Sequence, residues 1–206
     1  MPYKFIYFLL LQIICGLVKT ENNMKLESSD SRWQNYLESF LLKRHEQRDL
    51  IKQLIGNFSQ KGKGKAINMF METIIMILEK SRVTIESSGY TPGMTFPADA
   101  VLRDAVSRLL ENTAFISELT IYFPHIVKRF LNDTNAKATL LWSIAFCNST
   151  GFYDLKTTEL MYLVGQELGL IPANPDYVNP YQRKNLYFEE PRWTIDDTEK
   201  QKNDEL

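Results

Sequence analysis

The sequence predicts an all-α protein: a compact bundle of about five to six helices, followed by an extended arm rich in aromatic residues and proline and by a disordered tail. Apolar residues recur at spacings of three and four along most of the chain, and no segment offers a partner strand for a sheet. Hydrophobic residues make up 44% of the 206 residues and charged residues 24%, as in ordinary globular proteins. The expected parts are a signal peptide over 1–20, a helical domain over 28–171, an extended arm over 172–193 and a flexible tail over 194–206.

Two apolar stripes predict the first helices. Residues 28–30 supply polar side chains that can cap a helix, and an apolar stripe follows over 33–58. The charged run over 43–48 interrupts this stripe and is most simply explained as a solvated helix face. The glycines of the Lys-Gly repeat over 61–65 cost about 1 kcal/mol each inside a helix, so the repeat should break or loosen it. A second stripe over 67–85 indicates the next helix.

Prolines and apolar runs mark the later helices. Residues 87–93 form a loop by composition, and Pro97 stands where a new helix can begin. Pro124 falls inside an apolar stretch and should kink or split the helix there. The apolar run over 140–146 has a length that fits either a strand or a buried helix. Because helices flank it, we favour a buried central helix.

The arm follows the last predicted helix, which spans 155–168 and ends at Gly169, a residue suited to a left-handed cap. Four prolines rule out regular helix beyond it: Pro172, Pro175, Pro180 and Pro191. The aromatic side chains of the arm predict that it packs on the helical body or binds a partner. These partner-binding candidates are Tyr177, Tyr181, Tyr187, Phe188 and Trp193.

Both ends of the chain resemble targeting signals. Residues 5–18 are almost entirely apolar and follow Lys4, and this run is shorter than the ~20 residues of a membrane-spanning helix. The pattern favours a secretory signal peptide over an uncleaved anchor, so no stable membrane insertion is expected. The ending resembles the K-D-E-L signal, which a retrieval receptor reads, and predicts residence in the endoplasmic reticulum lumen, with partial secretion as an alternative. The residues of this ending are Asn203, Asp204, Glu205 and Leu206.

No catalytic or metal-binding pattern is visible. The two histidines, His45 and His125, belong to no metal motif; we expect His45 to be exposed and His125 to be structural. Cys147 closes an apolar run, which favours a buried side chain over a reactive thiol. The formal net charge of −1 gives no reason to expect a nucleic-acid partner. We therefore predict a protein that is not an enzyme and needs no cofactor or metal, with a thiol enzyme using Cys147 as the weakest alternative.

Three sequons predict N-glycosylation of a chain that enters the secretory pathway. Asn132 and Asn148 should lie at helix ends, where the backbone can extend for modification. Asn57 falls within or at the end of the first helix and is ranked lowest.

The body also resembles the coiled-coil domain-containing protein 134 family. The likeness covers residues 31–182 and is most specific over 97–169. The sequon at Asn148 matches a family position, and Glu205-Leu206 matches a family ending of Q-S-E-L. The residues that carry the resemblance are Glu111–Phe115, Phe123-Pro124, Ile126-Val127, Trp142, Phe146–Asn148, Thr150-Gly151, Gln166–Gly169 and Asn179-Pro180.

The resemblance implies an adaptor of the endoplasmic reticulum lumen. Its implied partners are the chaperone endoplasmin and the oligosaccharyltransferase at the translocon, where the family is thought to protect nascent endoplasmin from excessive N-glycosylation. The alternative that it implies is a secreted, cytokine-like regulator of mitogen-activated kinase signalling. A nuclear role is disfavoured, because this chain lacks the long basic run that precedes the end in vertebrate members. The resemblance implies no catalytic residue.

Overall fold

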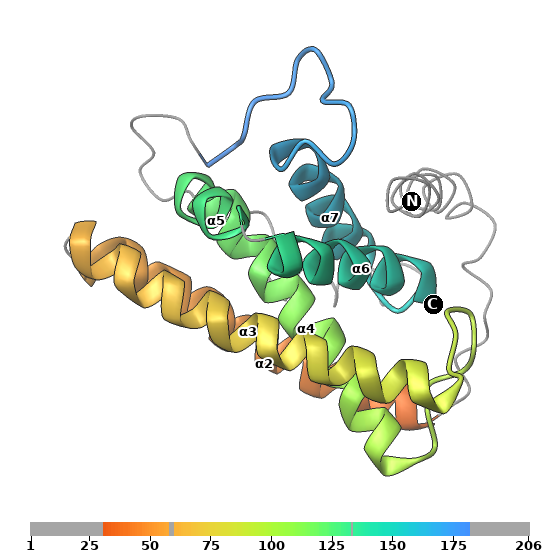
Figure 1. Cartoon of the computed structure of the whole chain (residues 1–206). Helices are drawn as coiled ribbons and strands as arrows, with labels where there is room; N and C mark the ends of the chain where they lie inside the picture. The colour runs from red at the N-terminus through yellow and green to blue at the C-terminus, as the bar shows by residue number, and fades with distance from the viewer. Residues whose placement is uncertain (1–30, 58–59, 133, 182–206) are drawn as a thin grey trace, which may run out of the picture.

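Six helices confirm the predicted all-α fold in the computed structural model, which describes residues 31–57, 60–132 and 134–181 (Figure 1). The predicted signal peptide, the retrieval-like ending and the arm residues Tyr187, Phe188 and Trp193 lie outside the described residues. The helices are α2 (Ser31–Asn57), α3 (Gln60–Ser88), α4 (Ala100–Tyr122), α5 (Pro124–Phe130), α6 (Thr134–Thr150) and α7 (Leu155–Glu167).

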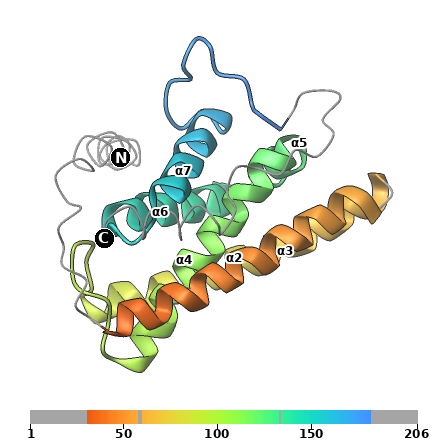
Figure 2. The same cartoon turned by 180° about the vertical axis from the view of Figure 1, so that it is seen from behind.

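Helix α4 lies at the centre of the fold. Every residue from Thr113 to Ile121 is buried, and α4 packs against each of the other five helices. Figures 1 and 2 show it passing among the long helices α2 and α3 and the shorter pair α6 and α7. The apolar run over 140–146 is a buried helix, as predicted, and belongs to α6. It is not the central element, because α6 has half-buried residues such as Leu141 and Phe146, whereas the middle of α4 has none.

Local chemistry sets both ends of α4. Its first residue is Ala100 because Asp99 is the N-cap, whose carboxylate accepts a hydrogen bond of 2.8 Å from the backbone N–H of Leu102. The predicted start at Pro97 was therefore three residues early. At the other end Pro124 splits the helix, as predicted, and becomes the first residue of α5.

The Lys-Gly repeat does not break a helix, contrary to the prediction. The residues over 61–65 belong to the first turns of α3, which begins at Gln60, whereas α2 ends at Asn57. The ammonium group of Lys63 donates 3.1 Å to the carbonyl of Ile55, which ties this end of α3 to α2. Packing of the buried residues from Ile67 onwards thus overrides the low helix propensity of the glycines.

An aromatic cluster joins the start of α2 to the loop before α4 and the turn between α6 and α7. Trp33 stacks on Phe152 at a centroid distance of 4.5 Å, and Tyr36 stacks on Phe96 at 4.7 Å. Phe96 also meets Phe152 edge-on at 5.5 Å. These pairs fix three chain segments that are distant in sequence.

The end of α7 leads into the arm as the sequence predicted. Helix α7 begins after the N-cap Asp154 and ends at Glu167, and Gly169 has a φ of 65°, the left-handed conformation that glycine adopts without strain. The chain then turns back, and the side chain of Ile171 lies 3.2 Å from where a Cβ on Gly165 would stand. Figure 1 shows the following segment, Pro172–Tyr181, running without helix from α7 towards α5. None of the described helices combines the length and the apolar character needed to cross a membrane.

Two glycine substitutions should have opposite effects on stability. Gly169→Ala places a Cβ in the left-handed region and should lower the free energy of unfolding by about 1 kcal/mol. Gly64→Ala adds a Cβ into open space on the helical backbone of α3 and should raise it by up to about 1 kcal/mol. Urea denaturation of both variants tests this, and a stabilised Gly169→Ala variant would contradict the assigned cap.

Candidate functional site

The charged run over 43–48 faces partly inward, contrary to the expected solvated helix face. Arg44 is only 3% exposed and Gln47 only 6%. Both occupy the inward positions between Phe40 and Ile51, so the apolar stripe of α2 continues through them with polar side chains. His45 is exposed, as predicted.

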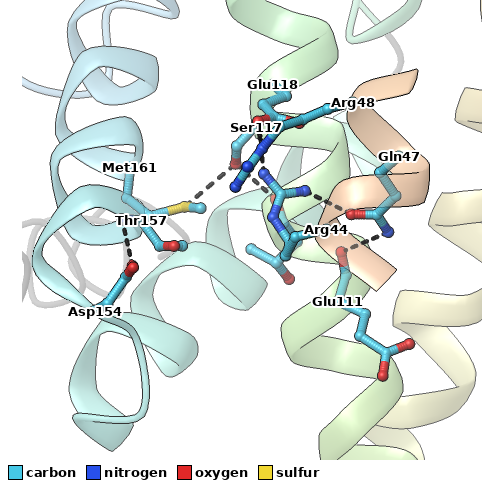
Figure 3. A network of polar contacts seen from close by, with 10 residues as sticks. Arg44, Gln47, Arg48, Glu111, Ser117, Glu118, Asp154, Thr157 and Met161 are labelled. Carbon is cyan, nitrogen blue, oxygen red and sulfur yellow. Dashed lines mark hydrogen bonds and ion pairs between the residues drawn. The ribbon is translucent and has the colours of Figure 1, made fainter. Parts of the chain in front are cut away.

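Arg44 and Arg48 meet the carboxylate of Glu118 on α4, and Figure 3 shows them converging on it from α2. Arg44 Nη2 lies 2.8 Å from Glu118 Oε1, and Arg48 Nε lies 3.4 Å from the same oxygen. Arg44 also donates to Gln47 Oε1, and Gln47 Nε2 donates 3.3 Å to the backbone carbonyl of Glu111. We call Arg44, Gln47, Arg48 and Glu118 the buried polar network.

The network's charge is not balanced by itself, since two guanidinium groups share one carboxylate. Among the described residues, Glu118 Oε2 and Arg44 Nε are buried without a hydrogen-bond partner. Such a pair adds little net stability over apolar residues of the same shape, but removing one partner leaves a buried charge. The network therefore acts chiefly to fix how α2 packs on α4.

A second polar cluster holds the arm against the body. Glu167 at the end of α7 is the acceptor for three donors and its side chain is only 7% exposed. Lys128 Nζ on α5 lies 2.6 Å from Oε1, while Tyr177 Oη and Asn179 Nδ2 of the arm donate to Oε2 over 2.9 and 3.0 Å. Asn179 Nδ2 also donates 3.0 Å to the carbonyl of Ile121, near the end of α4. We call Glu167, Lys128, Tyr177 and Asn179 the arm clasp.

The clasp determines the protonation of its carboxylate. Burial by itself raises the pKa of Glu167, but the hydrogen bonds from Lys128, Tyr177 and Asn179 outweigh burial and hold this pKa below its ordinary value. Glu167 is thus ionised at neutral pH and accepts all three bonds.

The arm continues beyond the clasp onto α4. Tyr181 packs on Tyr122 with a centroid distance of 4.3 Å. Burial, together with the neighbouring Tyr181 and Glu118, raises the pKa of Tyr122. Of the predicted partner-binding candidates, Tyr177 and Tyr181 therefore lie half-buried on the protein's own body.

The three sequons differ in accessibility. Asn132 is exposed in the turn that follows α5. Asn148 lies in the last turn of α6 with helical backbone, and its Oδ1 is buried without a hydrogen-bond partner among the described residues. The extended backbone expected at Asn148 is therefore absent from the folded chain, because the helix runs on to Thr150. Asn57 is the last residue of α2.

The single described cysteine is buried. Cys147 is fully buried, and burial raises the pKa of its thiol to about 12, although hydrogen bonds with Tyr153 and Thr113 act in the opposite direction. This agrees with the expected buried side chain. His125 is exposed at the start of α5, contrary to the expected structural histidine, because the inward positions of that helix belong to Pro124 and Val127. The described residues hold no group of three side chains placed to bind a metal ion.

The sequence predicts the contacts of neither polar cluster. The inward spacing of Phe40, Arg44, Gln47 and Ile51 is the signal that could place Arg44 in the interior. Nothing local marks Glu118. The resemblance includes Glu167 and Asn179, but their contact depends on the tertiary structure, because it joins α7 to the arm.

Comparison with known proteins assigns the family. A family model described as "ERK and JNK pathways, inhibitor" matches residues 21–205. The chain belongs to this family. A relative from Xenopus tropicalis named coiled-coil domain-containing protein 134 is 30% identical over 189 residues, which cover 91% of this chain and 82% of the relative. A relative of the same name from Mus musculus is 30% identical over 155 residues, covering 74% and 68%. No solved structure matches the chain.

These relatives confirm the resemblance drawn from the sequence, and the structure shows where its residues lie in this member of the family. Several of them are buried supports: Phe115 on α4, Trp142 and Cys147 on α6, and Gln166 on α7. Gln166 Oε1 accepts a hydrogen bond of 2.8 Å from the backbone of Asn174 in the arm. The resemblance thus rests largely on residues that hold the fold and the arm together.

Removing one arginine of the buried polar network should be far more costly than removing an exposed one. Arg44→Ala leaves Glu118 buried with Arg48 as its remaining cation, so we expect a loss of about 3 kcal/mol in the free energy of unfolding. Arg108→Ala is the matched control, because its pair with Asp104 is exposed and should contribute less than about 1 kcal/mol. If chemical denaturation shows equal losses of unfolding free energy for the two variants, the buried polar network contributes no more to stability than an exposed ion pair.

The arm clasp should give a characteristic pH dependence. A lowered pKa at Glu167 stabilises the fold above the ordinary value of 4.5, and this contribution is lost as pH falls through the lower folded-state value. Glu167→Gln should therefore be less stable than the parent at neutral pH, and the difference should shrink below pH 4.5. Glu159→Gln, an exposed change on the same helix, is the control. A difference that stays constant through the acid range would argue against an ionised clasp.

Proposed function

We propose that this chain is a non-enzymatic adaptor of the endoplasmic reticulum lumen that protects nascent endoplasmin from excessive N-glycosylation at the translocon-associated oligosaccharyltransferase. The observation that carries the proposal is the retrieval-like ending Asn203–Leu206. The partners are those that the resemblance to the coiled-coil domain-containing protein 134 family implies. The apolar leader over 1–20 supplies the route into the lumen.

The chemistry of the interior supports binding rather than catalysis. The thiol of Cys147 is fully buried with a raised pKa, so it is a poor nucleophile and disfavours a thiol enzyme. The charged groups of the buried polar network and the arm clasp bond mainly to one another. Such groups fix helices and the arm in place, and partners must then be recognised by the outer surface.

N-glycosylation of the chain itself fits a luminal protein. Asn132 is the sequon best placed for modification of the folded chain, because it is exposed outside a helix. Asn148 is helical and its carbonyl oxygen is buried, so its modification belongs before α6 folds.

The second candidate is a secreted, cytokine-like regulator of mitogen-activated kinase signalling. The family's description as an inhibitor of the ERK and JNK pathways favours it. The ending Asn203–Leu206 favours retention instead, which is why we place this function second.

The two candidates predict different fates for the chain in cells that lack their own family member. We expect the full chain to be retained, to co-purify with endoplasmin and oligosaccharyltransferase subunits, and to reduce the slowly migrating, hyperglycosylated form of endoplasmin. Deletion of Asn203–Leu206 should move the chain into the medium and abolish this protection, whereas Glu199→Gln, a tail change outside the ending that creates no sequon, should do neither.

The opposite result would support the secreted function. It would consist of equal amounts of full and truncated chain in the medium, unchanged endoplasmin glycosylation, and altered ERK or JNK phosphorylation in recipient cells.

A further inference from the structure

Alternate side chains of the arm contact the helical body. Tyr177, Asn179 and Tyr181 face the body, while Val178, which is 60% exposed, and Pro180 face solvent. Residues 177–179 have no helix or turn, and Pro180 and Tyr181 lie in a turn, where the Tyr181 N–H donates 2.9 Å to Asn179 Oδ1. The body therefore recognises side chains at every second position over 177–181.

The surface beneath the arm offers a fixed set of complementary groups. The Glu167 carboxylate accepts from a tyrosine hydroxyl and an asparagine amide, the Ile121 carbonyl accepts from the same amide, and the Tyr122 ring takes an aromatic side chain. Lys128 holds the carboxylate from the other side. We call Ile121, Tyr122, Lys128 and Glu167 the arm seat.

The arm is linked to α7 by an exposed connection. Residues 172–176 are exposed and contain two prolines. The backbone N–H of Asn174 donates 2.8 Å to Gln166 Oε1 and so ties this connection to α7. The hold on the arm thus rests on a few side-chain contacts at its far end. Each such hydrogen bond contributes modestly to stability, so the hold can be broken without unfolding the helices.

We propose that the arm is a releasable strap, which occupies within its own chain a seat that binds a partner segment with the same side-chain pattern. The geometry defines that segment: a tyrosine and an asparagine two residues apart, followed two residues later by an aromatic side chain. A partner segment of this chemistry competes with residues 177–181 for the carboxylate of Glu167 and the carbonyl of Ile121. The proposal goes beyond the adaptor function and holds in either compartment.

The test uses the full chain and a labelled peptide that copies its residues 172–184. A strap-released variant, Tyr177→Phe with Asn179→Ala, removes the donors of the arm but leaves the seat intact. Fluorescence anisotropy should show that this variant binds the peptide at least about tenfold more tightly than the parent chain, whose seat is occupied. Val178→Ser, an exposed change in the same arm, is the matched control and should behave like the parent.

Two further measurements decide whether the seat is the binding site. A peptide carrying the same Tyr177→Phe and Asn179→Ala changes should not bind, while one carrying Val178→Ser should bind normally. Adding Glu167→Gln to the strap-released variant should abolish binding. Hydrogen exchange of residues 172–181 reports release of the arm directly, and far-UV circular dichroism verifies that the helices remain.

Several outcomes would overturn the proposal. In one such outcome, hydrogen exchange shows that the arm of the variant is released, yet the peptide does not bind. The arm seat would then have no affinity for a separate segment. Another is equal binding by the parent chain, since the arm would then not exclude it. An arm that stays protected in the variant, or a parent chain that light scattering shows to be a dimer with exchanged arms, would also refute a strap closed within one chain.

Discussion

The burial of the second half of α4 on all sides is the constraint on which the rest of the structure depends. Between Thr113 and Ile121 no face of the helix meets water, so every polar side chain there needs a partner inside the protein. Ser117 and Thr120 find their partners within α4, because each hydroxyl donates a hydrogen bond of 2.7 Å to the backbone carbonyl four residues earlier. Glu118 instead pairs with two arginines of α2, Arg44 and Arg48.

The same helix explains why the arm lies where it does. Pro124 ends α4, and the last carbonyls of a helix lack partners within it. Asn179 takes up the carbonyl of Ile121 and simultaneously reaches Glu167 at the end of α7. The arm thus joins two helix ends that the body leaves incomplete, and its attachment is side-chain chemistry rather than a continuous apolar contact.

The outer surface of the protein is what remains available for recognition of a partner. Members of this family are described as pathway inhibitors, and the described part of this chain keeps its charged clusters and its thiol for internal structure. Under the proposed adaptor function, recognition lies in the outer faces and the arm seat. The proposed strap suits that task, because a partner segment can exchange with it while the core stays folded.

The sequence by itself determined the helices, the split at Pro124, the cap at Gly169 and the burial of Cys147, because each depends on sterics, backbone bonding or apolar pattern within a few residues. Only the tertiary structure decided that Arg44 is buried and that the Lys-Gly repeat is helical. The free energy of a buried charge depends on the partner that another helix supplies, and packing further along α3 outweighs the local cost of its glycines. The sequence also leaves open whether the arm binds its own body or a partner, and the structure decides this for residues 177–181, because Asn179 meets Glu167, 12 positions earlier.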